Sequence, residues 1–272
     1  MNRTPAAPTP RDDLALCHRL ADAADEITVH RYQATDLRVT SKPDATPVTD
    51  ADQSVEQTLR ARIEAERPGD AVHGEEYADT GTGPRRWIID PIDGTKNFLR
   101  GVPTWATLIS LSVDGEVTAA VVSAPLLGRR WWAGQGLGAF TRTTLPGTPD
   151  APRQIHTSRI ADLADASLSY SSLTGWRQLG LLAGFLQLHD TTWRQRAFGD
   201  FWSYMLLAEG AVDIAAEPEV ALHDLAAVSL IVTEAGGTFT DLHGTPGPDG
   251  GSAVATNTLL HTPVLDALHS HR

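Results

Sequence analysis

Two apolar runs separated by a two-residue turn constrain the fold of this chain more than any other feature. Residues 107–113 and 116–123 are rich in Val, Ile, Leu, Thr and Ala, and Asp114-Gly115 stands between them. Asp-Gly is a strong signal for a tight β-hairpin, because both turn positions take a positive φ. A third run, 130–133, is placed to extend the pair. The sequence therefore predicts an antiparallel sheet in the first half of the chain.

Helical periodicity and short strands precede this hairpin. Residues 12–33 and 55–66 place apolar side chains at helical spacing, and Pro68-Gly69 ends the second segment. The runs 71–73 and 86–89 read as strands, and each is followed by carboxylates. Residues 40–50 are polar and contain two prolines, which predicts a mobile loop.

The second half alternates strands with helices, which is typical of an α/β arrangement. A stretch rich in Thr, Pro and Gly at 141–152 predicts a boundary between an N-terminal α+β half, 1–145, and a C-terminal α/β half, 146–272. Residues 1–10 are expected to be a loose tail. The expected strands are 154–157, 168–170, 192–196, 211–215, 238–240 and 253–256, and the expected helices are 175–189, 200–209 and 223–235.

Composition limits the classes of partner. Of the 272 residues, 41% are hydrophobic, which fits a folded globular protein, and the formal net charge is −12. That charge disfavours binding to nucleic acid or to an anionic membrane, because both require clustered cations. No run is long and apolar enough for a membrane span. The N-terminus lacks the apolar core of a signal peptide, and the lone Cys17 suits a reducing compartment, so we expect a cytoplasmic protein.

The clearest chemical signal is the hexapeptide 90–95, Asp-Pro-Ile-Asp-Gly-Thr, at the end of an apolar strand. Asp90 and Asp93 flank a stiff proline turn and can face one small volume, where hard carboxylate oxygens suit Mg²⁺. Gly94 permits close backbone approach of an anion, and the Thr95 hydroxyl can hydrogen-bond an attacking water. Amides at the start of a helical turn favour phosphate. The hexapeptide therefore predicts metal-assisted phosphoryl transfer to water.

Three separated motifs resemble the inositol monophosphatase-like family of metal-dependent phosphatases. They are Gly-Glu-Glu at 74–76, the hexapeptide, and His-Asp-Leu-Ala-Ala at 223–227, in the family's order. The resemblance implies a mixed α+β fold with layered α-β-α-β-α packing, and a homodimer. It also implies two or three Mg²⁺ ions, bound by Glu75, Asp90, the Ile92 carbonyl, Asp93 and Asp224, with Asp90 among the catalytic residues.

The segment 42–52, Lys-Pro-Asp-Ala-Thr-Pro-Val-Thr-Asp-Ala-Asp, resembles the mobile loop of the same family. The resemblance implies that Asp44 helps Thr95 to activate water and that Lys42 approaches the substrate phosphate. One position departs from the family pattern, because His223 stands where Trp is usual. This departure leaves a non-catalytic, metal-binding relative as an alternative.

Substrate choice is expected to depend on the second half. Asp200 follows Gly199, at a position where inositol phosphatases typically carry a small or hydroxylated residue, and its charge favours a cationic alcohol. Residues 196–202, with Glu217 downstream, resemble the histidinol-phosphate phosphatases of the family. Arg196, Asp200 and Glu217 are thus expected to bind substrate together with Lys42, Asp93, Gly94 and Thr95. Inositol monophosphate, fructose 1,6-bisphosphate and 3′-phosphoadenosine 5′-phosphate remain alternative substrates.

Overall fold

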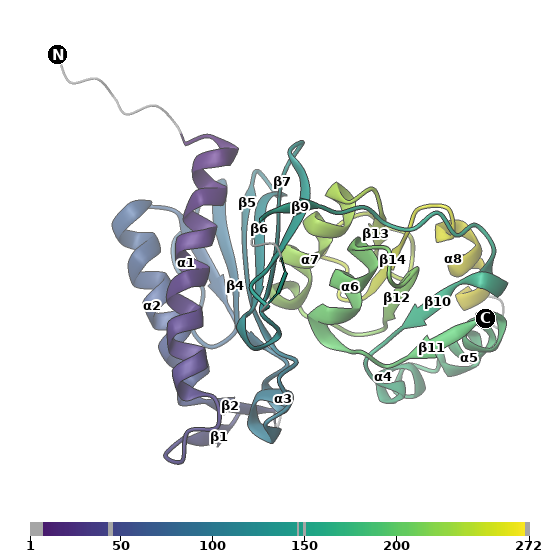
Figure 1. The fold of residues 1–272 in the computed structure, drawn as a ribbon, viewed down its shortest axis with the longest axis horizontal. Coiled ribbons are helices and arrows are strands. Elements are labelled where there is room, and N and C mark those ends of the chain that lie inside the picture. Colours follow the sequence, from purple (N-terminus) through teal and green to yellow (C-terminus); the bar gives the residue numbers. More distant parts are fainter. Residues whose placement is uncertain (1–7, 43–45, 146, 149–150, 270–272) are drawn as a thin grey trace.

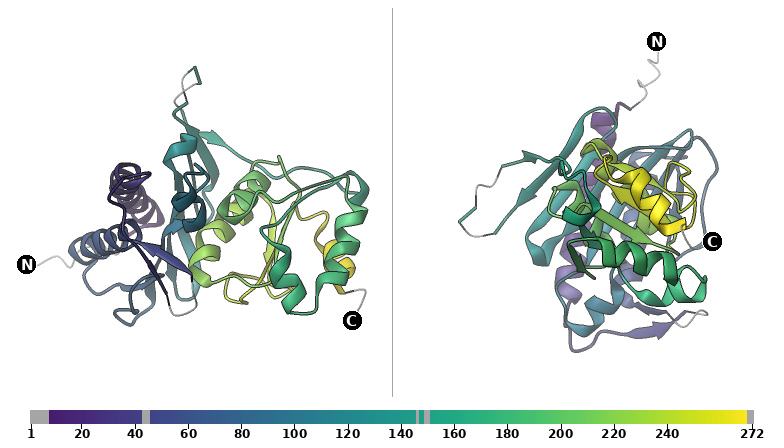
Figure 2. Two further views of the ribbon diagram at one scale, coloured as in Figure 1. Left: turned by 90° about the horizontal axis from the view of Figure 1, so that it is seen from below. Right: turned by 90° about the vertical axis from the view of Figure 1, so that its right-hand side faces the viewer.

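The computed structural model describes residues 8–42, 46–145, 147–148 and 151–269. Five layers follow one another across the molecule, in the order helices, sheet, helices, sheet, helices (Figure 1). This is the layered α-β-α-β-α fold expected from the sequence. The left view of Figure 2 shows the same layers from below.

The first helical layer consists of α1 (Pro10–Arg31) and α2 (Asp50–Glu66). Both helices begin with a capping box, in which Thr9 caps α1 and Thr49 caps α2. Their apolar faces pack on one side of a seven-stranded sheet, with Leu16, Leu59 and Trp87 fully buried between them. Thr9 and Pro10 therefore belong to α1 rather than to a loose tail, whereas residues 1–7 lie outside the described residues.

The seven-stranded sheet has the order β3-β4-β5-β6-β7-β8-β9. Only β3 and β4 run parallel among its neighbouring pairs. The hairpin at Asp114-Gly115 is confirmed, since both residues have a positive φ and Val113 pairs with Glu116. The strands are β3 (Ala71–Gly74), β4 (Arg85–Asp93), β5 (Ala106–Val113), β6 (Glu116–Ala124), β7 (Arg129–Gly134), β8 (Gly138–Thr143) and β9 (Arg153–Gln154).

The middle layer holds α6 (Asp200–Ala208) and α7 (Leu222–Glu234), which are buried between the two sheets. The second sheet has the order β11-β10-β12-β14-β13, and α4 (Leu173–Gln178), α5 (Leu182–Thr191) and α8 (His261–His269) cover its outer face. Its strands are β10 (Ser167–Ser169), β11 (Arg194–Arg196), β12 (Ile214–Glu217), β13 (Thr238–Thr240) and β14 (Ala253–Thr256).

Several elements differ from the sequence-based expectation. The single helix expected at 175–189 is divided into α4 and α5 around Gly180, whose φ is +72°. The strand expected at 211–215 is β12, three residues later, and β8 and α8 were not expected. Short strands β1 (Val39–Ser41) and β2 (Pro47–Thr49) pair where a loop was expected. Among the described residues, no helix is both long and apolar enough to span a bilayer.

Candidate functional site

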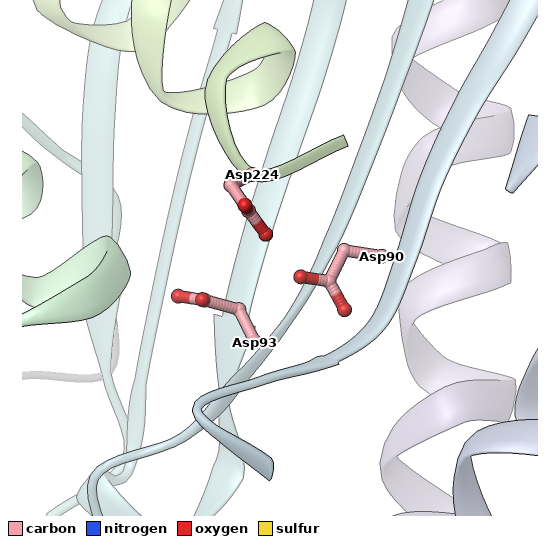
Figure 3. A group of neighbouring side chains, drawn as sticks. All are labelled: Asp90, Asp93 and Asp224. Carbon is pink, nitrogen blue, oxygen red and sulfur yellow. The ribbon is translucent and has the colours of Figure 1, made fainter. Parts of the chain in front are cut away.

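A bulge at the end of β4 turns two aspartates toward the same place. Residues three apart on a regular strand point to opposite faces. Here Asp90 pairs with Leu108 and Asp93 pairs with Ala106, so β4 contains one residue more than β5 over this stretch. Such an extra residue re-aims the side chains that follow it. As a result, the carboxylates of Asp90 and Asp93 lie on one side of the sheet (Figure 3).

Local hydrogen bonds fix the bulge. The Asp90 carboxylate accepts the backbone N–H of Ile92 at 2.9 Å. The buried Thr107 hydroxyl donates to the Pro91 carbonyl at 2.8 Å. Pro91 itself has no N–H to contribute to the strand pairing, and a bulge is one of the few positions in a sheet where proline fits.

The third aspartate comes from the opposite side of the site. Asp224 lies in the first turn of α7, where its carboxylate accepts the backbone N–H of Ala221. Figure 3 shows its side chain directed from the helix start toward Asp90 and Asp93. One carboxylate oxygen from each of the three residues lies within 4.8 Å of the other two. The structure thus brings together residues that are more than 130 positions apart in the sequence.

This cluster is electrostatically suited to a bound cation. Burial raises the pKa values of Asp90 and Asp93 well above the ordinary range, and the neighbouring carboxylates raise them further. Burial also raises the pKa of Asp224. Three carboxylates at this spacing, two buried and one half-buried, repel one another unless positive charge lies between them. An all-oxygen donor set of this kind fits Mg²⁺.

Glu75 approaches the same cluster because β3 and β4 are parallel neighbours. Gly74 pairs with Ile89, so Glu75, the residue after β3, follows on beside Asp90 of β4. The Glu75 carboxylate raises the pKa of Asp90 further, after burial. Lys42 donates to Glu75 at 2.6 Å and forms an ion pair with Glu76 at 2.8 Å. The Glu75 carboxylate, which is expected to bind metal, is thus paired with the Lys42 ammonium group.

Asp52 is a site residue that the sequence reasoning missed. Its Oδ2 atom accepts hydrogen bonds from the N–H and hydroxyl of Thr49 in the capping box of α2. Its Oδ1 atom lies 3.5 Å from the Thr95 hydroxyl, and burial raises the pKa of Asp52 to about 6. Asp44, which the loop resemblance pairs with Thr95, lies outside the described residues. A Thr-x-x-Asp pattern is typical of a helix start, so the sequence gives no separate signal that Asp52 also lies next to Thr95.

The turn after Asp93 places backbone groups beside the carboxylates. Gly94 has a φ of +85°, and an added Cβ would lie 3.1 Å from the Thr104 carbonyl. Thr95 begins the short helix α3 (Thr95–Arg100), and its hydroxyl donates to the Ile92 carbonyl at 3.0 Å. The Ile92 carbonyl therefore points to the Thr95 side of the site. Its role as a metal ligand stays a prediction.

Asp200 lies close enough to Asp93 and Asp224 to interact with both carboxylates. It begins α6 with a φ of +48°, and its N–H donates to Ser171 at 3.0 Å. Its carboxylate accepts from Asn97 of the Gly94 turn at 3.1 Å. The next residue, Phe201, donates its N–H to Asp93 at 2.6 Å. Through these two hydrogen bonds, the start of α6 holds the Asp200 carboxylate next to the turn that follows β4.

Glu217 and Arg196 occupy different depths of this region. Glu217 is buried at the end of β12, where it accepts from the Ser171 and Tyr204 hydroxyls. Burial raises its pKa to about 7. Arg196 is exposed at the end of β11, and its guanidinium donates to the adjacent Gln195 carbonyl. Contact of either residue with substrate stays a prediction.

His223 packs beside the cluster. Its ring is half-buried, with Nε2 3.8 Å from the Asp224 carboxylate, and it lies 6.0 Å from the ring of His73. The imidazole thus keeps a planar ring next to Asp224 at the position where tryptophan was expected.

Comparison with known proteins identifies relatives of the chain and of its fold. The model of the inositol monophosphatase family matches residues 12–272. A histidinol-phosphatase of Mycobacterium tuberculosis is 57% identical over 261 residues, covering 95% of this chain and 98% of that protein. A histidinol-phosphatase of Streptomyces coelicolor is 54% identical over 262 residues, covering 95% and 97%.

Solved structures give the same result. An inositol monophosphatase from Zymomonas mobilis superposes with a TM-score of 0.82 at 31% identity, covering 96% of this chain and 99% of that one. The suppressor protein SuhB from Bartonella henselae superposes with a TM-score of 0.85 at 26% identity, covering 95% and 98%. The chain belongs to the inositol monophosphatase family.

Proposed function

We propose that this protein is a Mg²⁺-dependent histidinol-phosphatase, which hydrolyses histidinol phosphate to histidinol and inorganic phosphate. The observation that carries the proposal is the position of Asp200 beside the converging carboxylates of Asp90, Asp93 and Asp224. The near full-length identity to two histidinol-phosphatases supports it.

The chemistry of the substrate explains why this position matters. In histidinol phosphate, the ammonium group is on the carbon next to the one that carries the ester oxygen. A phosphate held by Mg²⁺ at the three aspartates therefore brings the ammonium group of the same substrate within a few ångströms of these residues. Asp200, half-buried beside Asp93, offers a carboxylate for a charge-assisted hydrogen bond at that distance. Inositol monophosphate has only hydroxyls to offer there.

The residues around Thr95 suit the activation of water. In our proposal the Thr95 hydroxyl, which donates to the Ile92 carbonyl in the structure, turns its hydrogen to Asp52 Oδ1, 3.5 Å away, and accepts a hydrogen bond from the attacking water. As the water oxygen bonds to phosphorus, its proton passes to the Thr95 oxygen and the Thr95 proton passes to Asp52. The ester P–O bond breaks, and the histidinol oxygen leaves and takes a proton from solvent. The Gly94 turn offers backbone N–H groups to the phosphate oxygens. Lys42 and Asp44 remain proposed contributors from the loop.

We infer that two or three Mg²⁺ ions bind Glu75, Asp90, the Ile92 carbonyl, Asp93 and Asp224. When bound, Mg²⁺ lowers the pKa of water and neutralises charge on the phosphoryl group. The buried carboxylates supply the donors, and their mutual repulsion in the absence of a cation favours uptake of the metal.

Steady-state kinetics test the substrate. With Mg²⁺ present, kcat/KM for histidinol phosphate should exceed the values for inositol 1-phosphate, fructose 1,6-bisphosphate and 3′-phosphoadenosine 5′-phosphate. Equal turnover of any of these esters would contradict the substrate assignment while leaving the phosphatase assignment intact. No turnover of any ester, with metal bound, would favour the non-catalytic alternative.

Asp200→Asn tests the ammonium contact. Loss of a charged hydrogen bond costs about 1.5–3 kcal/mol, so kcat/KM for histidinol phosphate should fall roughly 10–100-fold. Hydrolysis of esters whose alcohol carries no positive charge, such as 4-nitrophenyl phosphate, should change little. Asp190→Asn, an exposed acid on α5, is the matched control. An equal loss on both substrates would show that Asp200 does not select the alcohol.

We also infer that the protein forms a homodimer. Trp193, next to the edge strand β11, is 70% exposed, and a large apolar side chain at a sheet edge suits an interface. Light scattering should give twice the chain mass, and Trp193→Glu should shift it toward the monomer. A monomer mass at micromolar concentration would contradict the inference.

A further inference from the structure

A buried carboxylate on α2 holds the turn that carries Glu75. Glu56 is fully buried in the middle of the helix. Its Oε2 accepts the backbone N–H of Glu76 at 2.7 Å, and its Oε1 accepts that of Tyr77 at 3.2 Å. Both donors belong to the turn after β3 that begins with Glu75. A carboxylate that satisfies two backbone amides at once fixes the path of that turn.

Arg60, one helical turn further on, completes this contact. Its guanidinium donates to Glu56 at 2.8 Å, and the charge pair balances a carboxylate that would otherwise be costly to bury. It also donates to the Tyr77 carbonyl and the Thr80 hydroxyl, each at 3.1 Å. Glu56 and Arg60 together therefore bind donors and acceptors of the same turn.

Gly74 shows how closely the two segments approach. A Cβ built on Gly74 would lie 2.0 Å from Glu56 Oε1. The φ of Gly74 is not positive, so glycine serves here to provide space rather than an unusual backbone angle. The Glu56 carboxylate thus presses directly against the backbone of the residue that precedes Glu75.

We propose that Glu56, supported by Arg60, is a positioning residue that holds the Glu75 carboxylate at the Asp90 cluster and thereby raises the affinity for Mg²⁺. The same helix carries Asp52 in its first turn, beside Thr95. A single rigid element therefore aligns the Glu75 turn and the partner of Thr95. The inference rests on the proposed function only for the role of Glu75 as a metal ligand.

Glu56→Gln and Arg60→Met test this role. Gln keeps the size of the side chain, but it has one acceptor oxygen where Glu56 uses two, so its NH₂ group opposes one backbone donor, and the ion pair with Arg60 is lost. Removing a group that orients a metal ligand typically weakens metal binding about 10–100-fold. We expect that loss in Mg²⁺ affinity, measured by calorimetry on the substrate-free protein. At saturating Mg²⁺, most of the wild-type kcat should return.

Asp13→Asn is the matched control. Asp13 is also a buried helical carboxylate, paired with Arg67 and Arg85, but it contacts neither the Glu75 turn nor the aspartates. It should lower the melting temperature in the manner of Glu56→Gln while leaving Mg²⁺ affinity at the wild-type value. An equal loss of Mg²⁺ affinity in Asp13→Asn would overturn the proposal, because the effect would then be one of general stability.

Wild-type Mg²⁺ affinity in a folded Glu56→Gln protein, as judged by circular dichroism, would also overturn the proposal. If Glu56→Gln does not fold, Arg60→Met decides, because it removes the contacts of Arg60 with Glu56, Tyr77 and Thr80. A loss of Mg²⁺ affinity of about 10-fold or more in folded Arg60→Met would support the proposal, and wild-type affinity would overturn it. Because Mg²⁺ binding is measured without substrate, the outcome does not depend on which phosphate ester the enzyme prefers.

Discussion

At the scale of single residues, the site combines carboxylates that are unfavourable for the fold with contacts that keep them in place. Asp90 is buried next to Glu75, Asp224 and Asp93, and its pKa is raised in consequence. Enzymes commonly accept lower stability where the site requires it.

Asp90→Asn should therefore separate activity from stability. The amide oxygen can still accept the Ile92 N–H, while one charge leaves the cluster. We expect kcat/KM to fall by about 10³-fold or more, because the charge that holds the metal is gone. In EDTA at pH 7.5 the variant should melt at a higher temperature than the wild type. A lower melting temperature would show that the carboxylate stabilises the metal-free fold.

Asp52→Asn should affect the reaction without affecting metal binding. Asn can still accept the Thr49 N–H, but its NH₂ group then faces Thr95 and the proton acceptor is lost. We expect kcat to fall about 10²–10⁴-fold with Mg²⁺ affinity unchanged. Asp50→Asn, in the same helical turn but paired with Arg31, should retain kcat. Equal losses of kcat in both variants would show that the effect comes from disturbing the start of α2 and not from the loss of a proton acceptor.

The sequence indicates some of these residues and conceals others for physical reasons. Asp90 and Asp93 are recognisable because the bulge that unites them lies within one short motif. Asp52 is concealed because its pattern is that of a helix cap. Glu56 is concealed because a charged residue followed by arginine four positions later is typical of a solvated helix face.

At the scale of elements, α1 packs against β7 through His18. The imidazole lies 5.0 Å from Trp132 in an edge-to-face arrangement. Burial lowers the pKa of His18 to about 4, and the charges of Arg130 and Arg142 lower it further, opposed by Asp22. The folded state therefore holds this side chain neutral at pH values where an unfolded histidine is protonated.

This pKa predicts acid destabilisation through one helix. Because the unfolded state binds the proton more readily, the contribution of His18 to stability is complete above about pH 6.5 and falls as the pH drops toward 4. His18→Gln should reduce the difference in unfolding free energy between pH 7.5 and pH 5, measured by urea denaturation. An unchanged difference would mean that His18 does not contribute to it.

Elements with a strong local signal were predicted well, and elements that tertiary packing creates were not. The hairpin at Asp114-Gly115 depends on two turn residues and is confirmed. By contrast, α8 (His261–His269) is short, and a helix of this length has little stability of its own. It forms against the outer face of the second sheet through Val264 and Leu268.

At the scale of the whole molecule, α7 connects the two halves. It packs on β4 to β8 of the first sheet, and its other neighbours include β13 and β14 of the second. One core cluster holds Trp131 and Ala139 of the first half together with Phe201 and Ile231 of the second. This core includes residues from both sides of the predicted boundary between 1–145 and 146–272. The division into two halves therefore stays a prediction.

A chain shortened to residues 1–145 should therefore fail to fold cooperatively. Without α6 and α7, the inner face of the seven-stranded sheet is open to water. We expect no sharp thermal transition and strong binding of a hydrophobic dye, in contrast to the intact chain. A cooperative transition in this fragment would show that the first half is independent.

Mg²⁺ should stabilise the molecule as a whole, because its proposed ligands come from β4 and from α7. A ligand at 100 times its Kd adds about 2.7 kcal/mol. Scanning calorimetry in Mg²⁺ and in EDTA should show this difference for the wild type and its loss in Asp224→Asn. No change in the wild type would contradict metal binding at this site.

The close approach of Gly74 to Glu56 also has an evolutionary consequence. A Cβ added at the position of Gly74 would lie 2.0 Å from Glu56 Oε1, which is too close for two unbonded atoms. A relative with a side chain at this position therefore needs a shorter or differently directed side chain at the position of Glu56. The two positions are therefore expected to change together across the family, although 17 residues separate them along the chain. We expect a single substitution at Gly74 to destabilise the fold. Replacing both residues together would allow the Glu75 turn to take a different conformation.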